Sequence, residues 1–232
     1  METSLHRQLK RHYAPTEAEC EVTLGGYRID AIADGRLIEI QQSALFAIRQ
    51  KISVLVKKHD VLLVKPLVGN KTLLLRPAGS IDGPLEGMRR RLSPKHETVW
   101  NLFDELVHFR GVFPHPRLTI QVLLTDQTEI RRPRPPRRRR QKDYIVEDRS
   151  LDGVTAEFEI STVADILRLI PPGLPAEFTT ADLAKLLGES RSLAQKILYV
   201  LRFSDGATDL GRRGRTPFYR LNSPVRRRRR AA

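Results

Sequence analysis

Polar and apolar residues alternate on both sides of Asp34-Gly35, within the stretch Tyr27–Ser43. This period of two predicts two strands, and an Asp-Gly pair between them is the strongest short-range signal for a β-hairpin, because both turn residues need a positive φ. A two-residue loop at this point places Asp30 directly opposite Glu39, with Gln41 two residues further along the same face. The other face of the hairpin is apolar and suits a core.

The rest of the first 130 residues alternates between helical and strand patterns. Apolar residues at helical spacing predict helices at Leu5–Tyr13, at Ala44 to about Lys58 with Ser43 as N-cap, and at Glu97–Phe109. Short apolar runs predict strands at Val22–Leu24, Val61–Val64, Thr72–Leu75 and Leu118–Leu124. Residues 76–96 are rich in Pro and Gly, which predicts a loop. We therefore expect an α/β domain over residues 1–130.

Arginine and proline dominate the segment that follows this domain. Residues 131–140 hold seven arginines, and residues 226–230 hold five more. The formal net charge is +14, and without these twelve arginines it is +2, so the charge is concentrated in two runs. Such runs suit non-specific contact with phosphates, or they are solvated tethers. We expect a linker at 131–145, a second domain at 146–223 and a basic tail at 224–232.

The second domain shows three short helical patterns, at Thr162–Ile170, from Thr180 to Gly188 and from Ser190 to about Phe203, followed by two short strands around a basic glycine turn. This order resembles a winged helix-turn-helix domain. The resemblance implies DNA contacts by the start of the third helix and by the wing. Such a domain can also serve protein pairing. The candidate DNA-binding residues are Arg191, Ser192, Gln195, Lys196, Arg212, Arg213 and Arg215.

Other classes of protein are not indicated by the sequence. Cys20 is the single cysteine, so neither a disulfide framework nor a cysteine-rich zinc site is possible within one chain. The first residues are polar and carry no signal-peptide pattern, and no apolar run approaches the length of a membrane span. We expect a cytoplasmic protein that does not interact with a membrane.

The predicted pairing of Asp30 with Glu39 suggests a site for a divalent metal ion. Like charges directly opposite each other, with Cβ atoms about 5 Å apart, destabilise a sheet. A divalent cation offsets that repulsion, since Mg²⁺ commonly uses one or two carboxylates and takes its remaining ligands from water and phosphate. A metal held in this way activates water and polarises a phosphodiester. The alternative is a solvated sheet edge at which both carboxylates point into water.

The same residues resemble the PD-(D/E)XK nuclease superfamily. Arg28-Ile29-Asp30, Ile38-Glu39-Ile40-Gln41 and Ser43 are similar to the E-x-Q variant of competence CoiA-like nucleases, over roughly residues 1–130. The resemblance implies a restriction-endonuclease-like α-β-β-β-α-β core and a phosphodiesterase that uses Mg²⁺ or Mn²⁺.

The resemblance assigns Asp30 and Glu39 as metal ligands, and Glu21 is the candidate for a further carboxylate. Gln41 stands where these nucleases usually carry lysine, and it cannot supply a positive charge. Lys51, on the following predicted helix, is the candidate that supplies it, and Arg49 is its neighbour.

These expectations combine into a DNA nuclease with a C-terminal DNA-binding domain; a homodimer stays open. Two alternatives remain. One is a catalytically inactive nuclease fold that binds DNA or acts as a scaffold, which Gln41 favours. The other is an RNA-binding protein, because arginine-rich segments also bind RNA.

Overall fold

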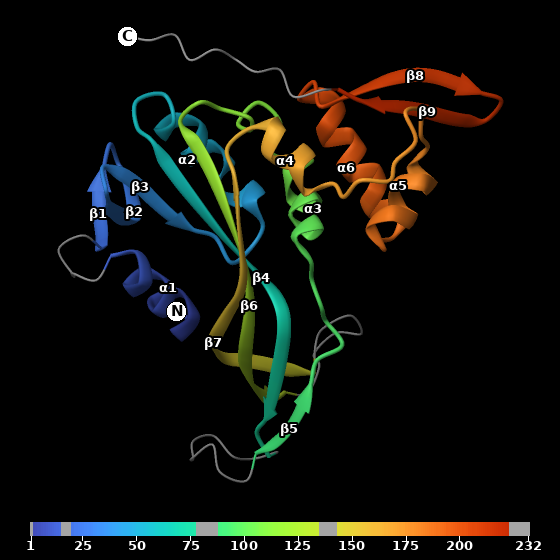
Figure 1. The fold of residues 1–232 in the computed structure, drawn as a ribbon. Coiled ribbons are helices and arrows are strands. Elements are labelled where there is room, and N and C mark those ends of the chain that lie inside the picture. Colours follow the sequence, from blue (N-terminus) through green and yellow to red (C-terminus); the bar gives the residue numbers. More distant parts are fainter. Residues whose placement is uncertain (1, 15–19, 78–87, 135–142, 223–232) are drawn as a thin grey trace. The chain divides into compact units, whose positions relative to one another are not determined.

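The structure is a computed structural model that describes residues 2–14, 20–77, 88–134 and 143–222. The chain divides into two compact units (Figure 1). Unit 1 comprises residues within 1–42, 62–99 and 121–158. Unit 2 comprises residues within 43–61, 100–120 and 159–232.

Unit 1 contains most of a seven-stranded sheet. Within the described residues the strands lie in the order β1-β2-β3-β4-β6-β7, and β5 pairs antiparallel with the end of β4. Their bounds are β1 Cys20–Leu24, β2 Tyr27–Ala33, β3 Arg36–Ile40, β4 Val61–Leu75, β5 Arg89–Leu92, β6 Leu118–Pro133 and β7 Tyr144–Ile160.

Helix α1 (Ser4–Tyr13) packs against the sheet of unit 1. Leu5 and Leu9 are one turn apart, so they lie on the same face of the helix. Both are buried in a cluster with Ala31, Ile38 and Ile40 of the β2–β3 hairpin, and other members come from β4 and β6. This apolar contact holds α1 beside the hairpin.

Unit 2 is mainly helical, with one two-stranded sheet. Its long helix α6 buries an apolar stripe that includes Leu193, Ile197 and Leu201. The elements of this unit are η2 (Leu45–Ile48), α2 (Arg49–Leu55), most of η3 (Val99–Leu102), α3 (Phe103–Leu106), α4 (Val163–Leu169), α5 (Thr180–Leu187), α6 (Arg191–Phe203), β8 (Ala207–Arg213) and β9 (Thr216–Leu221). The chain is therefore a mixed α/β protein, as its sequence predicts.

Side-chain caps fix the ends of the C-terminal helices where the sequence predicts them. Thr162 and Thr179 each form a capping box with the Asp three residues later, and Ser190 accepts from the Leu193 amide. Gly188 ends α5 in the left-handed conformation, with φ of 66°.

Within the described residues no helix is long and apolar enough to cross a membrane.

Several predicted elements in the first part of the chain were wrong in their bounds. Ser43 does not cap the following helix: Ala44 is the N-cap, without a side-chain bond, and the Leu45 amide donates instead to Glu105 Oε2 at 2.9 Å. The helix predicted at Glu97–Phe109 is a 3₁₀ turn followed by the four-residue α3. The two strands predicted at 61–64 and 72–75 are one strand, β4.

Two strands were missed altogether. Arg89–Leu92, predicted as loop, forms β5 against β4. Tyr144–Ile160 forms β7 beside β6, so Val146, where a second domain was expected to begin, lies inside the seven-stranded sheet. Of the expected linker, residues 135–142 lie outside the described residues, and so does all of the expected tail.

Candidate functional site

The predicted β2–β3 hairpin is confirmed. Ala33 pairs with Arg36, Ile32 with Leu37 and Ala31 with Ile38. Asp34 and Gly35 form its turn with φ of 51° and 72°, the two positive values that this turn type requires.

Asp30 lies one residue beyond these pairs, and its carboxylate makes two contacts. Oδ2 accepts a hydrogen bond from the Ile40 amide at 2.8 Å. Oδ1 lies 3.2 Å from Nε2 of His6 on α1. The carboxylate thus connects the end of the hairpin to the first helix.

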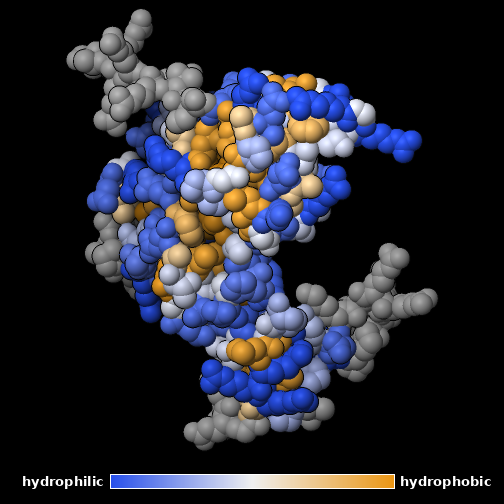
Figure 2. Space-filling model, turned by 45° about the vertical axis from the view of Figure 1, so that its right-hand side comes forward, coloured by the Kyte–Doolittle hydropathy of each residue, from blue (hydrophilic) through white to orange (hydrophobic). Residues whose placement is uncertain are grey.

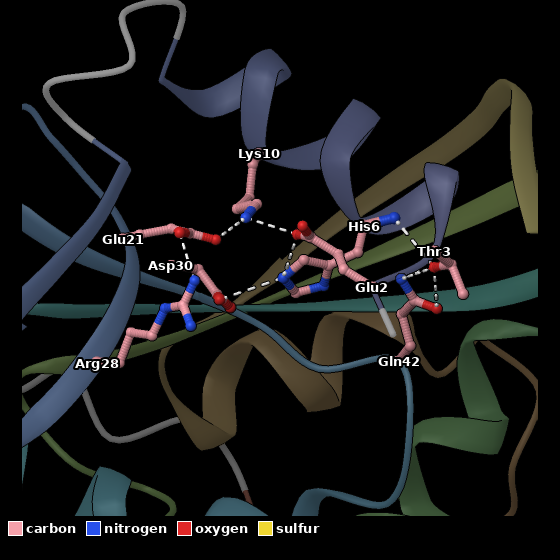
Figure 3. A pocket seen from close by; sticks show the side chains of 8 residues that line it. All are labelled: Glu2, Thr3, His6, Lys10, Glu21, Arg28, Asp30 and Gln42. Atoms are coloured by element: carbon pink, nitrogen blue, oxygen red, sulfur yellow. Dashed lines mark hydrogen bonds and ion pairs between the residues drawn. The ribbon is translucent and has the colours of Figure 1, made fainter.

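A pocket of about 390 Å³ opens around Asp30 (Figure 3). Helix α1 and the residues before it contribute one side of the lining, and β1, β2 and Gln42, two residues after β3, contribute the other. The lining residues are Glu2, Thr3, His6, Lys10, Glu21, Arg28, Asp30 and Gln42.

Alternating charges run across this pocket. Lys10 Nζ lies 2.5 Å from Glu2 Oε1 and 2.7 Å from Glu21 Oε1, and Arg28 also pairs with Glu21 (Figure 3). Hydrogen bonds from Lys10 and Arg28 lower the pKa of Glu21 to about 2. Burial opposes the charge of Lys10, but its bonds to Glu2 and Glu21 raise its pKa above the ordinary value. Both groups are therefore ionised at neutral pH.

The structure brings some of the predicted site residues together in one pocket lining, and others are not part of that lining. Asp30 and Glu21 line one pocket. Glu39, on β3, is only 4% exposed and does not line it. Gln41 follows β3, and its backbone amide donates to the Val64 carbonyl at 2.9 Å. Lys51 lies on α2, in unit 2.

Sequence reasoning missed the contribution of the first helix. His6 and Lys10 are four residues apart, so they lie on one face of α1, close to the apolar positions that dock the helix. This polar stripe beside Leu5 and Leu9 was readable in the sequence. Its proximity to Asp30 was not, because it depends on how α1 packs on the sheet.

The side-chain atoms of this pocket that could coordinate a metal fit a magnesium ion only if water and substrate supply most of its ligands. Within the described ranges no three His, Cys, Asp or Glu side chains form a group arranged to hold a metal ion. Asp30 and Glu2 do place carboxylate oxygens 3.2 and 3.6 Å from the same His6 nitrogen. Mg²⁺ is commonly bound through one or two carboxylates, with water and phosphate in the remaining positions.

The predicted DNA-binding residues of unit 2 lie mainly at its surface. Arg191, Ser192 and Gln195 are exposed at the start of α6, and Lys196 forms an ion pair of 2.7 Å with Asp104. Three exposed arginines lie near the tip of the β8–β9 hairpin, where one of them also pairs with Glu177. They are Arg212, Arg213 and Arg215.

Comparison with known proteins places the chain in a family. A family model described as "Domain of unknown function (DUF8091)" matches residues 3–161. The chain belongs to the DUF8091 family. The DUF8091 match runs from α1 to the end of β7, so it includes the seven-stranded sheet and every residue that lines the pocket except Glu2.

A relative of this DUF8091 protein extends over nearly the whole chain. It is an uncharacterized protein of Treponema pallidum (strain Nichols), 28% identical over 227 residues, which cover 96% of this chain and 86% of the relative. No solved structure matches.

Proposed function

We propose that this DUF8091 protein binds DNA and hydrolyses its phosphodiester bonds with Mg²⁺ or Mn²⁺ at the Asp30 pocket. The observation that carries the proposal is the position of Asp30. It lies at the end of the predicted hairpin, in a pocket that also holds a histidine, further carboxylates and two cations. A metal-dependent hydrolase needs this combination of ligand types and charge stabilisation at one place.

The order of the elements supports the proposed likeness to the PD-(D/E)XK superfamily. The chain runs α1-β1-β2-β3-α2-β4, which is the α-β-β-β-α-β order that the resemblance implies. Asp30 is on β2 and Glu39 on β3, the strands on which the resemblance puts the two metal ligands.

In this proposal Asp30 would hold the metal from the pocket, and Glu39, buried on the neighbouring strand β3, would have to turn its side chain toward it to become the second ligand. A bound metal would activate water and polarise the phosphate. Gln41 orients water or phosphate through its amide, since it carries no charge. The positive charge that a lysine supplies in related nucleases then has to come from elsewhere. Lys10 and Arg28 already lie in the pocket with Asp30, so we propose them as the source of that charge.

Unit 2 would hold the DNA. Three helices followed by a two-stranded hairpin support a winged helix-turn-helix, with the exposed start of α6 as the element that enters the major groove. The exposed arginines near the β8–β9 tip suit contacts with the phosphate backbone, which position the duplex without reading its sequence.

One observation favours the second candidate, a DNA-binding scaffold without catalysis. Both carboxylate oxygens of Asp30 have partners inside the protein, and one of them is the Ile40 backbone amide. A carboxylate that completes backbone hydrogen bonding at the end of a hairpin has a structural role that needs no metal.

Cleavage of a mixed panel of linear, nicked, single-stranded and branched DNA with Mg²⁺ or Mn²⁺ tests both candidates. Wild type is compared with Asp30→Asn and Glu39→Gln, and Asp60→Asn, at an exposed carboxylate in unit 2, is the matched control. DNA retention and thermal unfolding are measured for every variant.

Catalysis predicts that Asp30→Asn and Glu39→Gln each lose at least about 100-fold in cleavage rate, the scale of removing one electrostatic contribution to a transition state. Both should still bind DNA, and the control should match wild type. Binding by wild type with no cleavage of any substrate would establish the scaffold instead. A metal-independent activity that survives both substitutions would move the reaction away from this hairpin.

A further inference from the structure

A second charged region lies at the end of unit 1 where β5 pairs with β4. We call it the basic sheet end and define it by Arg76, Arg89–Arg91, Arg131, Arg132 and Arg149. In the space-filling view this end of the sheet is mostly hydrophilic, with a small apolar patch (Figure 2). It is distinct from the Asp30 pocket, whose lining includes none of these residues.

One buried carboxylate anchors three cations in this region. Glu129, only 3% exposed at its side chain, lies 3.0 Å from Lys71, 2.6 Å from Arg131 and 2.8 Å from Arg149. The four residues come from the three neighbouring strands β4, β6 and β7. One negative charge thus faces three positive charges.

A second carboxylate is shared in the same way. Glu147 pairs with Arg76 at 2.9 Å and with Arg132 at 3.3 Å. Two carboxylates therefore hold five cations, which leaves an excess of +3 in the paired part alone.

Strand β5 adds three more positive charges. Arg89, Arg90 and Arg91 are all exposed and pair in register with Leu75, Leu74 and Leu73 of β4. Successive residues of a strand point to opposite faces, so these arginines offer charge on both sides of the sheet edge.

The excess of positive charge does not stabilise the fold, because like charges held close together repel each other. An anionic partner removes the repulsion. Seven of the eight cations in this region are arginines and only Lys71 is a lysine. The planar guanidinium matches phosphate in a bidentate fork.

We propose that the basic sheet end binds the phosphate backbone of a nucleic acid, as a contact separate from the Asp30 pocket and from unit 2. Arginines spread over β5, β6 and β7, with Arg76 directly after β4, suit a repeating polyanion better than a single small anion. The choice of DNA as that polymer rests on the proposed function; the binding itself does not require catalysis.

The test uses the full chain and a fluorescein-labelled duplex oligonucleotide, with binding measured by anisotropy over a range of salt concentrations. The variant is Arg89→Gln/Arg90→Gln/Arg91→Gln, whose side chains are exposed, so folding should be unaffected. The control is Lys57→Gln/Lys58→Gln/Arg168→Gln, which removes the same charge from exposed positions in unit 2. Thermal unfolding confirms that both variants fold.

The β5 variant should lose two to three units of slope in the plot of log affinity against log salt, about 0.9 for each phosphate contact removed. The control should keep the wild-type slope. Equal slopes in the β5 variant and wild type, or equal losses in variant and control, would overturn the proposal.

Two further measurements identify the partner and distinguish nucleic-acid binding at the basic sheet end from the proposed cleavage at the Asp30 pocket. Unlabelled DNA should displace the probe far better than poly-glutamate; equal displacement would assign the surface to acidic polypeptides and overturn the nucleic-acid assignment. The β5 variant should still cleave at saturating DNA if the protein is a nuclease. Salt-dependent binding without any cleavage would sustain the basic sheet end and reject only the catalytic proposal.

Discussion

Replacing Glu129 by Gln removes the charge that holds the basic sheet end together. The side chain is almost fully buried and accepts from Lys71, Arg131 and Arg149. Glutamine keeps the size of the side chain but leaves three cations facing a neutral group. We expect a large loss of stability because a buried charge without its partner is costly.

The magnitude follows from the pKa of Glu129. Burial alone would raise it, but hydrogen bonds from Arg149, Lys71 and Arg131 lower it from 4.5 to about 2. A difference of about 2.5 units, at 1.36 kcal/mol each, corresponds to about 3 kcal/mol. Burial lowers the pKa of Lys71 in the same cluster, so part of the attraction is offset by desolvation. The value agrees with the lower end of about 3–5 kcal/mol for breaking a buried ion pair.

The pH dependence has a defined sign. The folded pKa of Glu129 is depressed, so its contribution is present above the unfolded pKa of 4.5 and is lost as the pH falls through about 2. Urea unfolding at neutral pH should show Glu129→Gln to be less stable by about 3 kcal/mol, and the difference from wild type should shrink between those two pH values. Glu159→Gln, at an exposed position of β7, is the control and should change little. A neutral-pH difference below about 1 kcal/mol, the scale of an exposed pair, would refute the reasoning.

Three further substitutions test the backbone and the packing by chemical denaturation. Gly35→Ala should cost about 1 kcal/mol, because φ at this turn is 72° and a Cβ is strained there; a variant as stable as wild type would contradict the turn geometry. Gly206→Ala should cost about 1–3 kcal/mol since its Cβ would lie 2.7 Å from the side chains of Leu201 and Val163, whereas Gly153→Ala, with nothing within 4 Å, should cost less; the reverse order would count against this packing. Thr179→Ala should cost about 1 kcal/mol by removing the cap on the Asp182 amide, and an unchanged stability would count against this cap.

Local patterns were sufficient wherever one short segment determines its own structure. The Asp34-Gly35 turn fixed the register of its hairpin, and Thr179 and Ser190 fixed the starts of two helices. In each case the residues that decide the conformation are within a few positions of one another. Propensity and capping rules act over that range.

Long-range packing decided what the sequence did not reveal. Strand β7 is half-buried along most of its length and carries many charged residues. Its sequence therefore lacks the regular alternation of apolar and polar residues that marks a strand with one face in the core and one in solvent. Strand β5 is four exposed residues whose assignment depends on pairing with β4. Glu105, which receives the Leu45 amide, lies 60 residues further along the chain, so the correct helix start was not visible locally.

Under the proposed function, the charges of the Asp30 pocket would make its contact with phosphate depend on metal. With His6 neutral, three carboxylates and two cations leave a formal charge of −1. A phosphate that approaches this pocket alone is repelled, whereas one divalent cation reverses the sign to +1 and attracts it. The basic sheet end carries an excess of positive charge without any metal. Metal removal should therefore weaken DNA contact at the pocket and leave salt-dependent binding at the basic sheet end intact. The two sites can then be measured separately in one protein, the pocket by its metal dependence and the basic sheet end by its salt dependence.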